Sequence, residues 1–143
     1  MKLALAPLFA VLLVPGTAVA QPRPFSCVGA DQLESDTFAI PFAPRATEVD
    51  DAARAALEPV AALGKREPER NLCVLGHASP QEGGATTGTQ LAARRAGAVA
   101  EALATLGVER DRVRAEAQRA AFARGGPVPA ERSVTVIVLP PQP

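Results

Sequence analysis

Residues 72–100 read LCVLGHASPQEGGATTGTQLAARRAGAVA, and this stretch sets the architecture of the chain. It begins with a compact apolar run, residues 72–75, which is typical of a strand buried on both faces. A loop of small residues follows His77, the only histidine in the sequence. Apolar residues then recur at helical spacing, forming the stripe Leu91, Ala98, Val99, Ala102, Leu103 and Leu106. The stretch therefore predicts a buried strand, a glycine-rich loop and an amphipathic helix.

The ends of this helix carry recognisable signals. Thr87 stands three residues before Gln90, which is the spacing of a capping box and predicts that the helix begins at Thr87. Gly107 follows the apolar stripe, where glycine can take the left-handed conformation that closes a helix, with Val108 folding back on the last turn.

An earlier helix is predicted from a second capping-box spacing, Thr47 to Asp50, followed by apolar residues at helical periodicity. Pro59 falls inside this helix and should kink it, because proline lacks an N–H and crowds the preceding turn. We expect Gly64 and Pro68 to end the helix.

Three further strands complete the pattern. Residues 37–42, TFAIPF, contain Pro41 and suit an edge strand or a bulge. Residues 112–117 give a weak strand signal, and residues 134–139 a strong one. The order strand-helix-strand-helix-strand-strand predicts an α/β two-layer sandwich, with a mixed sheet and both helices on one face. Neither an internal repeat nor a second domain is visible.

Residues 1–20 have the pattern of a secretory signal peptide: a positive Lys2, a short apolar core and a small-residue cleavage site. We expect the mature chain to begin at Gln21 with a proline-rich leader (residues 21–35) that is mobile over residues 21–24, followed by one domain (residues 36–140). No later apolar segment is long enough to cross a membrane. Loss of Lys2 takes the formal charge from 0 to −1, which gives no general attraction to nucleic acid.

Cys27 and Cys73 are the only cysteines. Two cysteines in an exported protein most often pair, so we predict a disulfide between them. Lipidation of Cys27 would need a leucine and small residues before it, and Pro24-Phe25-Ser26 does not fit.

The loop after His77 does not match the motifs of common enzymes. Gly83 and Gly84 are followed by neither a lysine nor a dinucleotide-binding glycine pattern, so a nucleotide cofactor is not expected. Ser79 lacks the spacing of a hydrolase nucleophile, and no second histidine could serve as its base. We expect His77 to be structural, donating to a backbone carbonyl. One histidine and two paired cysteines also leave no ligand set for a metal.

The start of the second helix remains as a candidate anion site. Free N–H groups in a first helical turn favour a carboxylate or phosphate, and the fork of Arg95 suits a bidentate carboxylate. Arg94 points about a quarter-turn away. The alternative is that both arginines are solvated, or that they pair with Glu101 or Glu48.

From about residue 36 to residue 139 the sequence resembles an OmpA-like domain, a periplasmic module that grips peptidoglycan. LCVLGHAS is similar to the family's second strand ending in Gly-His-Thr-Asp, and LAARRAGAV to its Leu-Ser-x-x-Arg-Ala signature. LATLGVERDRV and ERSVTVIV are similar to later family motifs, in the same order. An enzyme that acts on the cell wall would need a general base, a metal site or a pair of carboxylates; the sequence offers no plausible set, so we expect the chain not to be an enzyme.

In that family an aspartate meets the ammonium of diaminopimelate in the peptidoglycan stem, and the signature arginine meets its carboxylate. Arg95 matches this arginine. Ser79 stands at the aspartate position and Gly88 at that of a usual asparagine, while Glu82 could meet the ammonium in a variant related to Gly-His-Ala-Ser-Pro-Glu-Gly. The resemblance thus implies Arg95, Ser79 and Glu82 as ligand-binding residues, and the amides of the helix start add Gly83, Gly84 and Thr87 to the predicted set.

Two hypotheses follow. In the first, the protein is a periplasmic module, associated with the outer membrane or cell wall, that binds a stem-peptide carboxylate through an Arg95 guanidinium left unpaired by its own chain. Replacing the usual aspartate by serine removes a charge-assisted contact, worth about tenfold in affinity or more. In the second, the fold is a structural or protein-interaction module with an envelope protein partner, and the apolar edge strand at residues 38–42 is its contact surface.

Overall fold

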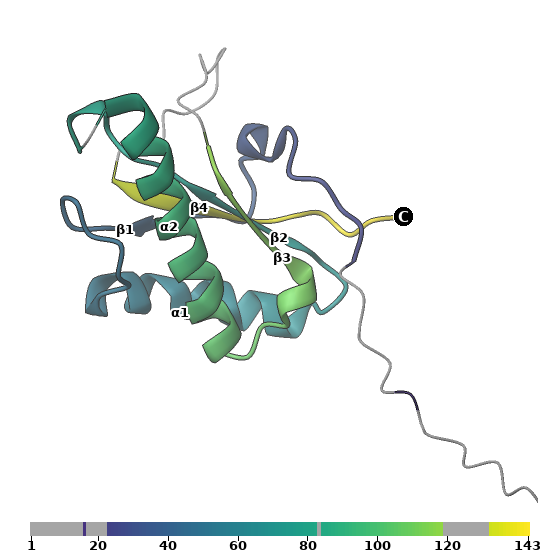
Figure 1. Ribbon diagram of the computed structural model, residues 1–143. Coiled ribbons are helices and arrows are strands. Elements are labelled where there is room, and N and C mark those ends of the chain that lie inside the picture. Colours follow the sequence, from purple (N-terminus) through teal and green to yellow (C-terminus); the bar gives the residue numbers. More distant parts are fainter. Residues whose placement is uncertain (1–15, 17–22, 83, 119–131) are drawn as a thin grey trace, which may run out of the picture.

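The computed structural model describes residue 16 and residues 23–82, 84–118 and 132–143. Apart from Gly16, the predicted signal peptide lies outside these residues. Within these described residues, two α-helices and four strands follow the predicted order (Figure 1), with the bounds β1 Thr37–Pro41, α1 Asp51–Arg66, β2 Leu72–Gly76, α2 Gly84–Thr105, β3 Val113–Ala117 and β4 Ser133–Val138. Three short 3-10 turns accompany them: η1 Ala30–Gln32, η2 Pro80–Glu82 and η3 Arg110–Arg112.

The described strands form one mixed sheet in the order β1-β4-β2-β3. Strand β2 pairs parallel with β3, and β4 lies antiparallel between β2 and β1. The predicted α/β sandwich with a mixed sheet is therefore confirmed. Pro41 lies on β1, at an edge of the sheet, where a missing N–H does not interrupt the ladder to a further strand.

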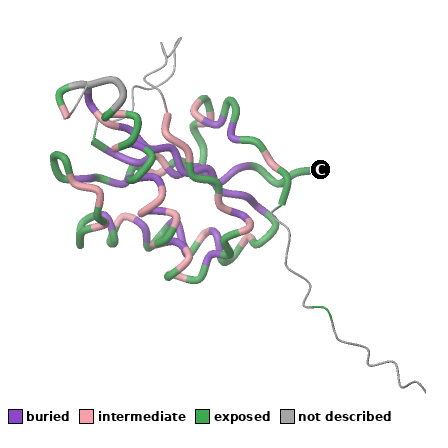
Figure 2. Tube along the Cα trace, viewed as in Figure 1, coloured by how far each residue is buried: buried purple, intermediate pink, exposed green. Residues whose placement is uncertain are grey.

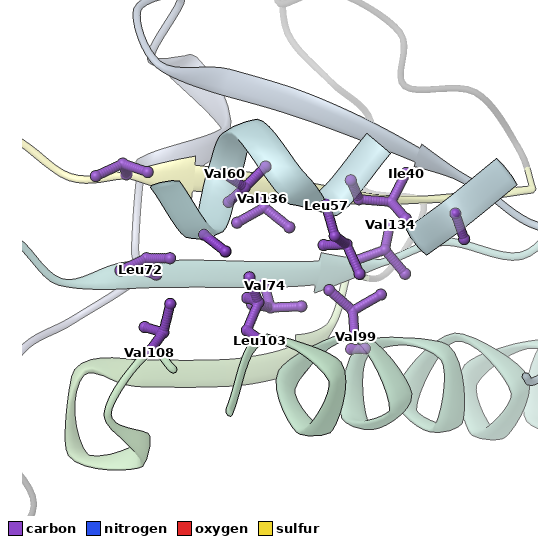
Figure 3. Close-up of a cluster of buried hydrophobic side chains, with 14 of the residues drawn as sticks. Ile40, Leu57, Val60, Leu72, Val74, Val99, Leu103, Val108, Val134 and Val136 are labelled. Carbon is purple, nitrogen blue, oxygen red and sulfur yellow. The ribbon is translucent and has the colours of Figure 1, made fainter. Parts of the chain in front are cut away.

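Both helices pack on one face of the sheet. Leu57 and Val60 of α1 and Val99 and Leu103 of α2 are fully buried, and they meet valines of β2 and β4 in a single apolar cluster (Figure 3). All five residues of β2 are buried, as the sequence predicts for a central strand (Figure 2). Burying a side chain of this size favours folding by about 1.5–3 kcal/mol.

The opposite sheet face is covered by the segment before β1. Cys27 forms a disulfide with Cys73 of β2, with a Cα–Cα distance of 5.7 Å, which confirms the predicted pairing. Around this bond lies a second apolar cluster, consisting of Cys27, Ala30, Cys73, Leu75, Ile137 and Leu139, with Phe25 and Leu33 packed against it. Residues 25–33, which fall within the predicted proline-rich leader, therefore pack on the sheet and form part of its core.

The two predicted helix starts differ from the structure. Asp50, rather than Thr47, is the N-cap of α1, and its carboxylate accepts a hydrogen bond from the Ala53 N–H at 2.9 Å. Helix α2 begins at Gly84, so Thr87 lies inside the first turn and is not its N-cap. A capping spacing marks a residue that is able to cap, and the tertiary packing decides where the helix begins.

Of the two predicted helix ends, that of α2 agrees with the structure and that of α1 does not. At the end of α2, Gly107 has φ +100°, and the Gly107 and Val108 N–H groups bond back to Ala104 and Leu103, as predicted for a glycine-closed helix. Gly64, expected to end α1, instead lies buried inside it.

Helix α1 continues through Pro59 to Arg66 and is closed by a buried arginine, Arg112. The Arg112 guanidinium donates to the Gly64 carbonyl oxygen at 2.9 Å and to the Arg70 carbonyl oxygen at 3.0 Å, and it pairs with Glu109. Carbonyls at a helix end lack partners in their own helix, so Arg112 satisfies one of them.

Candidate functional site

Arg95 lies at the middle of α2 and is fully buried, with 0% of its surface exposed. It reaches away from its helix to three other segments. Its Nε–H donates to the Ala46 carbonyl at 2.8 Å, Nη1 to the His77 carbonyl at 3.1 Å and Nη2 to the Ala43 carbonyl at 3.4 Å. The guanidinium also donates to both carboxylate oxygens of Glu82, from Nη2 at 2.6 Å and from Nη1 at 3.0 Å. These five contacts equal the five N–H donors of an arginine.

Glu82, at the end of η2, is the acid that neutralises Arg95, and only 6% of its side chain is exposed. Its Oε1 also accepts from the Arg45 N–H at 2.9 Å, and its Oε2 from the Ser79 N–H at 2.9 Å. The hydrogen bonds from Arg95, more than those from the backbone, lower the pKa of Glu82 from 4.5 to about 2, although burial opposes this change. Glu82 is therefore ionised at neutral pH, and it cannot serve as a general acid there.

The expectation that Arg95 is left unpaired is wrong. The alternative partners are also not found, because Arg95 pairs with Glu82 while Glu101 pairs with Arg110 on the exposed side of α2. Arg94 is exposed, as its quarter-turn offset predicts. Spacing along α2 reveals neighbours on the same helix, whereas the acid that binds Arg95 comes from the loop before it.

A short turn between β1 and α1 completes the surroundings of the ion pair. The Ala46 N–H donates to the Ala43 carbonyl at 3.0 Å, and Arg45 inside the turn has φ +60°. The Arg95 guanidinium carbon lies 5.6 Å from the centroid of the Phe42 ring, within the range of a cation–π contact. Nothing in the spacing of residues 72–100 indicates these contacts, because they come from a segment about 50 positions earlier.

The other predicted site residues occupy different places. Ser79 is buried and donates its N–H to Glu82, so it belongs to the support of the ion pair. Gly84 is the first residue of α2, and Thr87 is exposed on it. Gly83 lies outside the described residues. The structure thus brings together Arg95, Glu82 and Ser79 from the predicted set.

His77 is buried at the end of β2, and its Nε2 lies 2.9 Å from the Thr135 hydroxyl oxygen. The sequence suggested a backbone carbonyl as its partner; the imidazole contacts a side-chain hydroxyl instead. Burial lowers the pKa of His77 from 6.5 to about 4, because the charged form is poorly solvated there. The His77 carbonyl is the part of this residue that contacts Arg95.

The described residues offer neither a metal site nor a membrane-spanning helix. Among residue 16 and the three described ranges, no group of three or more histidine, cysteine, aspartate or glutamate side chains is placed to hold a metal ion. Within the same part of the chain, no helix has the length and apolar character needed to span a membrane.

The mixed sheet β1-β4-β2-β3, with two helices packed on one face, is an OmpA-like α/β fold. The sequence profile described as the OmpA family matches residues 41–132, more than half of the chain. The chain belongs to the OmpA family. The peptidoglycan-binding domains of this family are non-catalytic, so the protein is placed among non-enzymatic modules.

Solved structures share the fold. The peptidoglycan-associated lipoprotein from Burkholderia pseudomallei aligns with a TM-score of 0.58 and 24% identity, covering 71% of this chain and 88% of that one. The OmpA-like domain of FopA1 from Francisella tularensis subsp. tularensis SCHU S4 gives 0.60 and 18%, covering 78% and 80%. The C-terminal domain of Helicobacter pylori MotB gives 0.57 and 15%, covering 69% and 81%. Comparison with curated proteins gives no match.

Proposed function

We propose that the protein is a non-catalytic module of the bacterial envelope, at the periplasmic cell wall or outer membrane, that binds the peptidoglycan stem peptide by charge exchange at the Arg95–Glu82 pair. The observation that carries this proposal is the pair itself, one cation and one anion with 2.6 Å between their nearest polar atoms. Diaminopimelate carries a carboxylate beside an ammonium. The diaminopimelate carboxylate would replace the Glu82 carboxylate as the partner of Arg95. The diaminopimelate ammonium would then form an ion pair with the released Glu82.

Exchange differs from docking on a free arginine. Removing Glu82 from Arg95 without a replacement would leave two buried charges uncompensated, which costs about 3–5 kcal/mol. A ligand with both charges gives each residue a new partner and so offsets this cost. A ligand with a carboxylate alone would leave Glu82 unpaired. The site therefore favours a zwitterionic centre over a simple acid.

Family membership and the position of Arg95 in the LAARRAGAV signature support this proposal. The closed pair also lowers the expected affinity, because only the fraction of molecules with an open pair can bind. Two features therefore lower the expected affinity for peptidoglycan: the closed ion pair and the replacement of the usual aspartate by Ser79.

Competition between two small acids tests the exchange. The protein would be bound to purified sacculi and displaced with diaminopimelate or with pimelate, which has the same two carboxylates and no ammonium. We expect pimelate to be at least about tenfold less effective, because it cannot pair with Glu82. In Glu82→Gln this difference should disappear. Glu101→Gln, in an exposed ion pair of the same helix, is the matched control.

A second candidate function is favoured by one observation: all five Arg95 donors are satisfied within the chain. The module would then be structural or would bind an envelope protein, with Arg95 serving only the fold. Wild-type protein that is not retained on sacculi, together with a crosslinked envelope protein whose contacts avoid Arg95, would favour this function over the first.

A further inference from the structure

The turn between β1 and α1 directs three backbone groups at the ion pair. The Ala43 and Ala46 carbonyl oxygens accept from Arg95, and the Arg45 N–H donates to Glu82 Oε1 at 2.9 Å. The same Oε1 accepts from Arg95 Nη2 at 2.6 Å. One carboxylate oxygen therefore receives both the guanidinium and the peptide N–H of this turn.

Arg45 reaches this position only with an unusual backbone. Its φ of +60° lies in the left-handed region, which costs a residue other than glycine about 1–3 kcal/mol. The Arg45 side chain is exposed, and the contact it makes with the ion pair comes from its backbone. The conformation thus serves the placement of the N–H rather than that of the side chain.

We propose that Arg45 is a positioning residue whose left-handed backbone aims its N–H at Glu82 Oε1 and fixes the carboxylate on Arg95. The Ser79 N–H holds Oε2 from the opposite loop, at 2.9 Å. Glu82 is then fastened by two loops that are 34 positions apart in sequence, and the orientation of its carboxylate is set before any ligand arrives. Any effect of Arg45 on the exchange of Glu82 for a ligand rests on the proposed function. Its effect on the orientation of the Glu82 carboxylate in the free protein does not.

The test compares substitutions at position 45 that remove the same positive charge but differ in how readily the backbone adopts a positive φ. Arg45→Gly removes the cationic side chain but adopts φ +60° without strain and keeps the N–H. Arg45→Val removes the same charge and resists positive φ, because its β-branch crowds the backbone. The measurement is the pKa of the Glu82 carboxyl group, followed by carbon-13 NMR in the free protein.

We expect Arg45→Gly to keep the Glu82 pKa at about 2. Arg45→Val should raise this pKa by roughly one unit, because the carboxylate loses a donor to its charged form. Arg45→Asn, which tolerates the left-handed region, should behave like the glycine variant. If the valine variant does not fold, Arg45→Ala provides the same comparison with less strain.

Equal pKa values in the glycine and valine variants would overturn the proposal. A common rise would show that the Arg45 charge acts on Glu82, and no change in either would show that the N–H does not hold the carboxylate. Because no cell wall is present in this measurement, its result is independent of whether the protein binds sacculi.

Discussion

Arg95 and Glu82 form a two-point ion pair in which 0% of one side chain and 6% of the other is exposed. A pair this well buried differs from surface pairs such as Arg110–Glu101, where 67% of each side chain is exposed. Water screens the surface pair, whereas the buried charges depend on each other for compensation. The stability of the domain is therefore tied to its candidate site.

Neutralising Glu82 should destabilise the fold. We expect Glu82→Ala to lower the free energy of unfolding by about 3–5 kcal/mol at pH 7, because Arg95 is left buried without its acid. Urea denaturation followed by circular dichroism would measure the change. Glu101→Ala, which breaks the exposed pair, should give no measurable change, and an equal loss in both variants would contradict the role of burial.

Acid should weaken the same pair within a defined window. The folded-state pKa of Glu82 is about 2 and its ordinary value is 4.5, so the unfolded chain takes up the proton first as the pH falls. The stabilisation is complete above pH 4.5 and is lost towards pH 2, on the order of 3 kcal/mol in total. The free energy of unfolding measured against pH should fall more steeply between pH 4.5 and pH 2 in the wild type than in Glu82→Gln.

His77 should produce a separate slope at higher pH. Its pKa of about 4 in the fold lies below the ordinary 6.5, so protonation favours the unfolded chain. Stability is fully present above pH 6.5 and declines as the pH falls towards 4, again on the order of 3 kcal/mol. His77→Gln removes this titration, so between pH 6.5 and pH 4.5 its unfolding free energy should fall less than that of the wild type. An equal slope in the wild type and in the variant would show that His77 is not the group that titrates.

Two glycines offer a matched test of packing at the site. A Cβ at Gly76 would lie 1.9 Å from the Ala92 carbonyl oxygen, whereas a Cβ at Gly97 meets nothing within 4 Å. Gly76→Ala should cost about 3 kcal/mol or more, because β2 and α2 must separate. Gly97→Ala should stabilise by about 0.5–1 kcal/mol through helix propensity. Thermal unfolding of both variants distinguishes these opposite effects.

Loss of the disulfide should loosen the cover on the second sheet face. The double variant Cys27→Ser, Cys73→Ser removes a cross-link between positions 46 apart, worth about 4 kcal/mol by chain entropy. Denaturant unfolding with and without a thiol reductant would measure this difference in the wild type. The double variant should be insensitive to the reductant, and a wild type equally insensitive would contradict the expected contribution.

The elements could be predicted from the sequence wherever the pattern is local. The apolar run at β2, the alternating run at β4 and Gly107 after α2 each carry their signal within a few residues. The helix starts were less predictable. Thr47 and Thr87 have capping spacing, but Asp50 caps α1 and α2 extends to Gly84, because caps compete and packing selects among them.

The sequence identifies residues of the candidate site, but it does not indicate which of them contact one another. Arg95 stands out through the family signature, and Glu82 is the only acid between Gly76 and Gln90. Their pairing, and the support from Ser79 and from the Arg45 turn, depends on loops whose path no periodicity describes.

The cover over the second sheet face is a short segment held by Cys27 and Cys73, not a third helix. Maturation of this domain is therefore coupled to an oxidant. When the chain is made in a reducing compartment, the segment is held by non-covalent contacts alone, and partial release would bare apolar surface that invites aggregation. Formation of the Cys27–Cys73 disulfide in an oxidising compartment would hold the segment on the sheet and remove this hazard.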